Sequence, residues 1–87
     1  MNRLDQLINE IQGYKGNVNQ RTAIQIYNIL ENNKTLFLSK VEKENFTPVL
    51  KDFERLSNAS YLQSTSAEYK REYQRAYDLL AFHLNRI

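Results

Sequence analysis

The chain has 87 residues, a net charge of +2 from 12 basic and 10 acidic side chains, and no cysteine. This length predicts a single domain, residues 1–87, without a second core. The lack of cysteine excludes disulfides, thiolate metal sites and cysteine nucleophiles. The small excess of positive charge does not by itself require a nucleic-acid partner.

Apolar residues recur at helical spacing along the chain, and no segment of useful length alternates as a strand does. Glycine and proline, which sheets need for their turns, number only two and one. These features predict an all-α fold, a small antiparallel bundle of four principal helices. No apolar run is long enough for a signal peptide or a membrane span, so we expect a soluble, cytoplasmic protein.

The first half of the chain carries two amphipathic patterns. The first predicts a helix over about residues 3–14, capped by Asn2, with one apolar face made by Leu4, Leu7, Ile8 and Ile11. A second helix begins after Asn19, its predicted cap, and either stops or bends at Asn32 and Asn33, because Asn tolerates the left-handed conformation. The apolar residues 36–38 predict a short further helix or a bent continuation, which closes in the charged run 42–45.

The second half of the chain contains two predicted helix boundaries. Thr47 is predicted to cap a third helix with Pro48 at its first position, where a missing N–H is harmless. Its apolar face is Val49, Leu50, Phe53 and Leu56, with Tyr61 and Leu62 near its end. A last helix runs from about Ala67 almost to Ile87. Thr65 and Glu68 fit a capping box for it, and Ser66 is the alternative cap.

The residue inventory argues against catalysis. His83 is the only histidine, so a transition-metal site would lack ligands and no hydrolytic triad has a local motif. Glu42 and Glu44 are expected to face different directions, and no glycine-rich loop could hold a phosphate. We therefore predict a protein that is not an enzyme and that has no cofactor and no metal site. His83 is expected to pack at the end of the bundle.

The most distinctive pattern lies in the last helix. Three tyrosines recur every four residues, and two arginines form a parallel row beside them. One interpretation is ordinary packing, with the rings at the edge of the core and their hydroxyls in water. The other is a partner-binding face, because Tyr and Arg dominate protein interfaces. The candidate residues are Tyr69, Lys70, Arg71, Tyr73, Arg75 and Tyr77.

Several kinds of partner fit this face. A protein partner is favoured, because acidic residues interrupt the basic row and phosphate binding rewards unbroken positive charge. The alternative is a nucleic-acid-binding accessory protein that uses the same helix, since rings beside cations grip single strands. A homodimer is a further alternative.

One segment resembles a known family. Residues 44–50, Glu-Asn-Phe-Thr-Pro-Val-Leu, and residues 55–58, Arg-Leu-Ser-Asn, are similar to the third helix of bacteriocin immunity proteins of the enterocin A type. The resemblance covers about fifteen residues and implies a cytosolic protein that acts by binding a target complex. Together with a composition typical of AT-rich codons, it predicts an inhibitor, immunity or adaptor protein from a bacterium, phage or plasmid.

Overall fold

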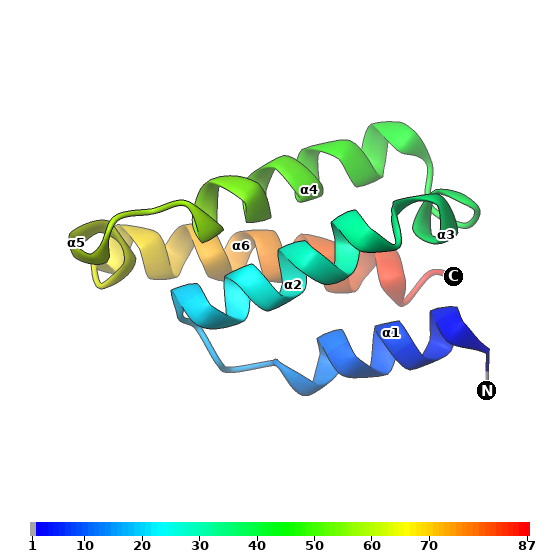
Figure 1. Cartoon of the computed structure of the whole chain (residues 1–87), viewed down its shortest axis with the longest axis horizontal. Helices are drawn as coiled ribbons and strands as arrows, with labels where there is room; N and C mark the ends of the chain where they lie inside the picture. The colour runs from blue at the N-terminus through cyan, green and yellow to red at the C-terminus, as the bar shows by residue number, and fades with distance from the viewer. Residues whose placement is uncertain (1) are drawn as a thin grey trace.

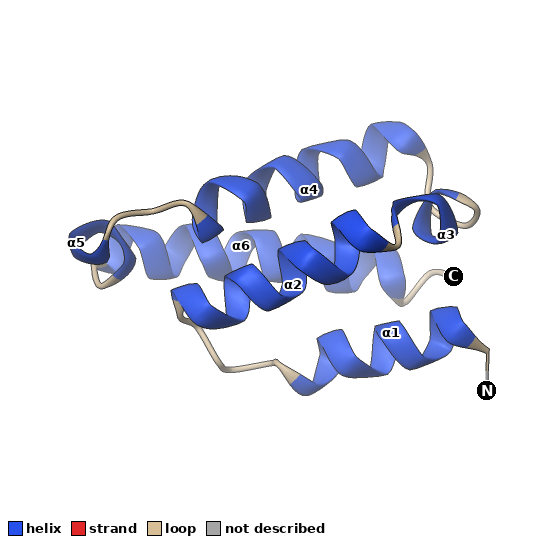
Figure 2. Ribbon diagram, in the orientation of Figure 1, coloured by secondary structure: helices blue, strands red, loops and turns tan. Residues whose placement is uncertain are grey.

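The computed structural model describes residues 2–87 and is all-α, as the periodicity predicts. This part of the chain forms six helices and no strand, and Figures 1 and 2 show how the helices are arranged. Four of the helices are long and two are short. In chain order they are α1 (Arg3–Gly13), α2 (Gln20–Asn32), α3 (Lys34–Leu38), α4 (Lys43–Ser57), α5 (Tyr61–Ser64) and α6 (Ala67–Leu84).

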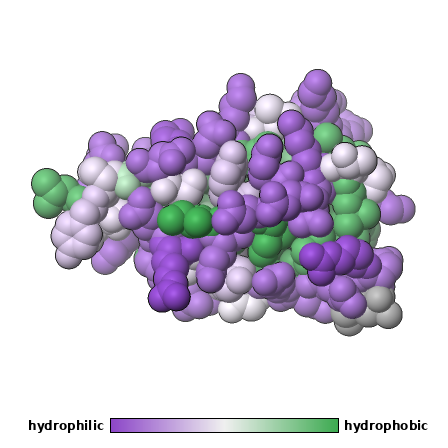
Figure 3. Space-filling model, viewed as in Figure 1, coloured by the Kyte–Doolittle hydropathy of each residue, from purple (hydrophilic) through white to green (hydrophobic). Residues whose placement is uncertain are grey.

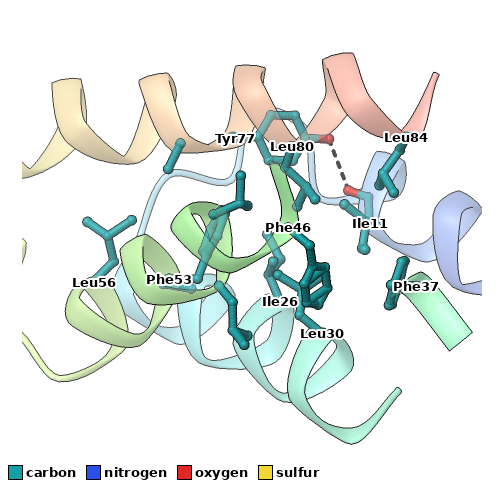
Figure 4. Close-up of a cluster of buried hydrophobic side chains, with 14 of the residues drawn as sticks. Ile11, Ile26, Leu30, Phe37, Phe46, Phe53, Leu56, Tyr77, Leu80 and Leu84 are labelled. Carbon is teal, nitrogen blue, oxygen red and sulfur yellow. Dashed lines mark hydrogen bonds between the residues drawn. The ribbon is translucent and has the colours of Figure 1, made fainter. Parts of the chain in front are cut away.

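One hydrophobic cluster joins the long helices, and α3 contributes Phe37 to it. α2 packs mainly against α4, and α4 packs against α6. The close-up in Figure 4 shows the apolar side chains of α1, α2, α4 and α6 pointing toward one another. Burying apolar area of this kind is the main favourable term in folding. The fully buried side chains include Leu7, Ile11, Ile26, Leu30, Phe37, Phe53 and Leu56.

Three of the predicted helix caps are confirmed. The side-chain oxygens of Asn2, Asn19 and Ser66 accept hydrogen bonds from the backbone amides three residues later. Each cap satisfies an amide that the first turn of a helix leaves without a partner. The capping box predicted for Thr65 and Glu68 is wrong, because Ser66 holds this position and α6 starts directly after it.

The predicted break after α2 is also present. α2 ends at Asn32, and the Asn33 side-chain amide donates to the carbonyl of Ile29 at 2.8 Å. α3 then forms the short helix expected from its apolar residues, and Phe37 closes the core. However, α3 ends at Leu38 and does not reach the charged run, which instead begins α4.

The predicted start of α4 is wrong. The helix begins at Lys43, so Thr47 is not its cap and Pro48 lies inside it. The physical reason is the burial of Phe46, whose ring packs 5.9 Å from that of Phe37 and is only 4% exposed. Extending the helix by a turn places Phe46 in the core. Pro48 forfeits a single hydrogen bond, to the carbonyl four residues earlier.

The predicted extension of α4 to Tyr61 and Leu62 is wrong as well. α4 ends at Ser57, and residues 61–64 form the separate one-turn helix α5. Ser60 caps α5 in a reciprocal capping box with Gln63. The side-chain amide of Gln20 on α2 fixes the connection between α4 and α5, because it donates to the carbonyls of Ser57 and Ala59.

Candidate interaction surface

The three tyrosines of α6 face the core. Tyr69, Tyr73 and Tyr77 are 4%, 1% and 5% exposed. Of the two interpretations of this row, packing against the core is therefore confirmed, and an exposed face that the rings share with the arginines is wrong. The reason is geometric: a four-residue repeat drifts slowly around the helix, so all three rings stay on the side that also carries Ala76, Leu80 and Leu84.

Two of these tyrosines tie α6 to the ends of other helices. The Tyr69 hydroxyl donates to the carbonyl of Leu56, near the end of α4, at 2.8 Å. The Tyr77 hydroxyl donates to the carbonyl of Ile11, near the end of α1, at 3.0 Å (Figure 4). Carbonyls in a final turn have no amide partner within their own helix. The hydroxyls supply such partners inside the protein, where we had expected them to be in water.

The middle tyrosine differs from its neighbours. The Tyr73 hydroxyl is buried and has no hydrogen-bond partner among the described residues. Its ring lies edge-on to that of Phe53, with the centroids 5.8 Å apart. Burial, reinforced by the neighbouring Tyr69 and Tyr77, raises the pKa of Tyr73 well above its ordinary value. The phenol therefore keeps its proton to a higher pH than a free tyrosine does, and its ring acts here as a packing group.

The basic candidate residues of α6, unlike its tyrosines, lie at the surface. Lys70, Arg71 and Arg75 are exposed, and none of them forms an ion pair within the described part of the chain. The acidic residue between them is engaged, because Glu72 pairs with Arg55 of α4 at 3.7 Å. A hydrogen bond from Gln74 to Asp78 occupies a second carboxylate at 2.9 Å. The arginines are thus available to a partner.

Sequence reasoning missed the continuation of the arginine row. Leu79 and Phe82 are 40% and 53% exposed and follow Arg75 at spacings of four and seven residues, on the side of α6 opposite the core. The Arg86 guanidinium carbon lies 5.2 Å from the centroid of the Phe82 ring. The signal in the sequence is helical spacing: Leu79 and Phe82 recur with Arg75 on the outward side of the helix, just as the tyrosines recur on the inward side. We call this set the α6 outer stripe: Arg71, Arg75, Leu79, Phe82 and Arg86.

Three further features that bear on function are His83, candidate metal-binding clusters and candidate membrane-spanning helices. His83 is partly buried, and its ring meets that of Phe82 edge-on at 5.4 Å. Nowhere in residues 2–87 do three His, Asp or Glu side chains lie where they could hold a metal ion. None of the helices in this range combines the length and the apolar character needed to cross a membrane.

Glu42 and Glu44 interact at the start of α4, which corrects the expectation that they face different directions. A hydrogen bond between the two side chains, together with the charge of Glu44, raises the pKa of Glu42. A hydrogen bond to its own backbone amide, followed by the bond to Glu42, lowers the pKa of Glu44. The pair is exposed and lies at a helix N-terminus, where negative charge is favourable.

Comparison with known proteins assigns this chain to no family. No family model matches it, and no curated protein or solved structure matches it significantly.

Proposed function

We propose that this chain is a non-enzymatic protein-binding protein and that the α6 outer stripe is its contact surface. The observation that carries the proposal is the exposure of Phe82 and Leu79 in register with Arg71 and Arg75. Aromatic residues and arginine are enriched at protein interfaces, where they supply a large share of the binding energy. Four of its five residues lie on α6, a long helix whose opposite side is anchored in the core, so this part of the stripe needs little ordering on binding.

The structural details favour a protein over a nucleic acid as the partner. Gripping a single strand requires exposed rings on which bases can stack. The tyrosines that supported this alternative are buried, which leaves Phe82 as the exposed ring of the stripe. Arg86 already lies over that ring, and Glu68 and Asp78 interrupt the positive charge. These features weaken electrostatic attachment to phosphates.

The same proposal includes an antiparallel arrangement of the long helices and an inhibitor, immunity or adaptor role. The course of the four long helices in Figure 1 supports an antiparallel bundle as the scaffold. The resemblance of residues 44–50 and 55–58 to the third helix of enterocin A-type immunity proteins is the basis for proposing an inhibitor, immunity or adaptor role. In such a role the chain would act by occupying a target protein, with Lys70 at the rim of the contact.

A photo-cross-linking experiment tests this function. A photoreactive amino acid replaces Phe82 in one variant and Ile24, a 41% exposed residue of α2, in a matched control. We expect protein adducts from position 82 in cells that naturally express the chain, and none of the same mass from position 24. Adducts that disappear after nuclease treatment, or equal adducts from both positions, would contradict the proposal.

Affinity then tests the arginines. Once the cross-linked protein is identified, the Arg71→Ala, Arg75→Ala double variant should bind it at least about tenfold more weakly, as expected for interface hot spots. The Lys34→Ala, Lys40→Ala variant removes two exposed charges elsewhere and serves as the control. Unchanged affinity of the arginine variant would remove the stripe from the interface.

A further inference from the structure

The α6 outer stripe carries its cationic and apolar side chains in a definite order. Arg71 and Arg75 lie toward one end, Leu79 and Phe82 in the middle, and Arg86 at the other end. The α6 residues of the stripe, from Arg71 to Phe82, extend about 16 Å along the helix axis. By contrast, the face that Figure 3 shows, which carries α1, α2 and α4 in Figure 1, is mainly hydrophilic. The stripe is therefore a surface where apolar cover and charge pairing can act together.

A groove on the α1 side of the stripe brings a further cation to its apolar centre. This α1–α6 groove has a volume of about 460 Å³ and is lined by both Lys15 and Phe82. The side-chain amide of Gln12 donates to the side chain of Asn85 at 3.1 Å, which joins the end of α1 to the residue after α6. Arg86 lies over the ring of Phe82. One cation of the groove and one of the stripe thus lie near the same apolar side chain.

The carboxylates beside the stripe leave it with an excess of positive charge. Glu72 is paired with Arg55 of α4, and Asp78, which lines the groove, accepts a hydrogen bond from Gln74. Glu68 is exposed near the start of α6. Four cations of the stripe and the groove form no ion pair within the described part of the chain: Lys15, Arg71, Arg75 and Arg86. Complementarity of charge therefore selects a negatively charged partner.

The chemistry of the side chains selects the form of that partner. A guanidinium group binds a carboxylate through two parallel hydrogen bonds. Apolar side chains such as Leu79 and Phe82 gain free energy when another apolar surface covers them. An amphipathic helix with acidic residues beside its apolar row meets both requirements, because residues three and four positions apart share one face.

Phosphate-bearing partners fit the stripe less well. An anionic membrane and the backbone of a nucleic acid each present closely spaced negative charges. Such charges would lie against the carboxylates of Glu68 and Asp78 as well as against the arginines. The carboxylates of a helix can instead be spaced so that they meet the guanidinium groups alone.

We propose that the segment bound by the α6 outer stripe is an acidic amphipathic helix of a partner protein, about three to four turns long. Its apolar residues cover Leu79 and Phe82. Carboxylates near one end pair with Arg71 and Arg75, and a carboxylate near the other end pairs with Arg86 or, across the groove, with Lys15. This inference rests on the proposed function, because it names the chemistry of the partner for the same surface.

Two designed helical peptides of about 16 residues test the preference for acidic charge. They share one row of leucines and differ only in the residues beside it, which are Glu in one peptide and Lys in the other. In titrations of the isotope-labelled chain followed by NMR, the Glu peptide should shift the amide signals of α6 and Lys15. It should bind at least about tenfold more tightly than the Lys peptide. Equal or weaker binding of the Glu peptide, or shifts confined to other helices, would overturn the proposal.

Charge reversal locates the preference. The Arg71→Glu, Arg75→Glu variant should prefer the Lys peptide, whereas Lys34→Glu, Lys40→Glu makes the same change of net charge elsewhere and should still prefer the Glu peptide. If circular dichroism shows that the first variant does not fold, Arg71→Gln, Arg75→Gln should abolish the preference. A reversal in both charge variants would show that only net charge matters. Displacement of the Glu peptide by phosphatidylserine vesicles or by a single-stranded oligonucleotide at equal charge would also count against an acidic helix.

The photo-cross-link at position 82 separates this inference from the proposed function. Mass spectrometry of the partner peptide attached there should identify a segment of net negative charge, with acidic residues three or four positions apart. A neutral or basic segment would refute the acidic helix and leave the proposed function standing. The absence of any protein adduct would remove the proposed function itself.

Discussion

The hydroxyl of Tyr77 donates a hydrogen bond to the carbonyl of Ile11, 3.0 Å away and 66 positions earlier in the sequence. This bond joins the middle of α6 to the last turn of α1. Tyr69 makes the equivalent bond to Leu56 in the last turn of α4, at 2.8 Å. Two residues of the row, Tyr69 and Tyr77, therefore act as internal ties, and the contact surface that we propose lies on the opposite side of α6.

Tyr69→Phe should lower the free energy of unfolding by about 1–3 kcal/mol, because a buried carbonyl then loses its partner. Leu56 is the last residue but one of α4, so no amide of that helix can replace the hydroxyl. Chemical denaturation followed by circular dichroism measures the change. A variant as stable as the native chain would mean that water replaces the bond.

Tyr77→Phe should cost less, about 0.5–1.5 kcal/mol. The Ile11 carbonyl also accepts from the backbone amide of Tyr14 at 3.0 Å, so it keeps one partner when the hydroxyl is removed. The same denaturation experiment, run beside Tyr69→Phe, gives the order. A larger loss for Tyr77→Phe than for Tyr69→Phe would contradict this account.

Tyr73→Phe should have the opposite sign and stabilise the fold by about 1–2 kcal/mol, because it removes a buried hydroxyl that lacks a partner. For a domain of this size, a gain of 1 kcal/mol raises the unfolding temperature by about 4–8 °C. Differential scanning calorimetry reads the shift. A lower unfolding temperature would indicate that the hydroxyl is satisfied in solution.

Alkaline pH should unfold the protein through these residues. Burial raises the pKa of Tyr69, Tyr73 and Tyr77 above the ordinary value of about 10. Above this pH the unfolded chain releases their protons while the folded chain retains them, so ionisation favours unfolding. Stability is therefore complete below about pH 10 and falls as the pH rises toward the folded pKa values. The tyrosinate absorbance of these three buried residues should appear together with the loss of helical circular dichroism, and ionisation of all six tyrosines in a chain that stays folded would disprove this.

The start of α4 offers a test at acidic pH. Glu42 occupies the cap position without making a cap hydrogen bond, and Glu44 raises its pKa. Glu42→Ser should raise the unfolding temperature at pH 7, because Ser caps well and the repulsion is removed. The gain should shrink as the pH falls through the pKa of Glu42, where protonation relieves the repulsion in the native chain.

Glu44→Gln is the matched control with the opposite sign. The pKa of Glu44 is lowered in the folded chain, so its charge stabilises the fold above the unfolded pKa and this contribution is lost as the pH falls. The variant should melt at a lower temperature than the native chain at pH 7. Equal effects of both substitutions would show that only the total charge matters.

Local patterns predicted most of the helical layout. Asn2, Asn19 and Ser66 can be recognised as caps because a short polar side chain reaches the amide three residues later without help from the rest of the fold. The apolar face of α4, with Phe53 at its centre, follows from helical spacing alone. Pro48 misled the prediction because burial of Phe46 against Phe37 extends the helix past it, and that contact depends on α3.

The sequence by itself determined that the chain is helical, where α1, α2 and α6 begin and which aliphatic residues form the core, because these depend on spacing within a few turns. Only the tertiary structure decided which side of α6 its tyrosines take. A ring with a hydroxyl suits the core or the surface equally well until a carbonyl such as that of Leu56 or Ile11 comes within reach. The exposure of Tyr61 and Leu62 was decided in the same way, since α4 ends before them and leaves no neighbouring helix to cover them.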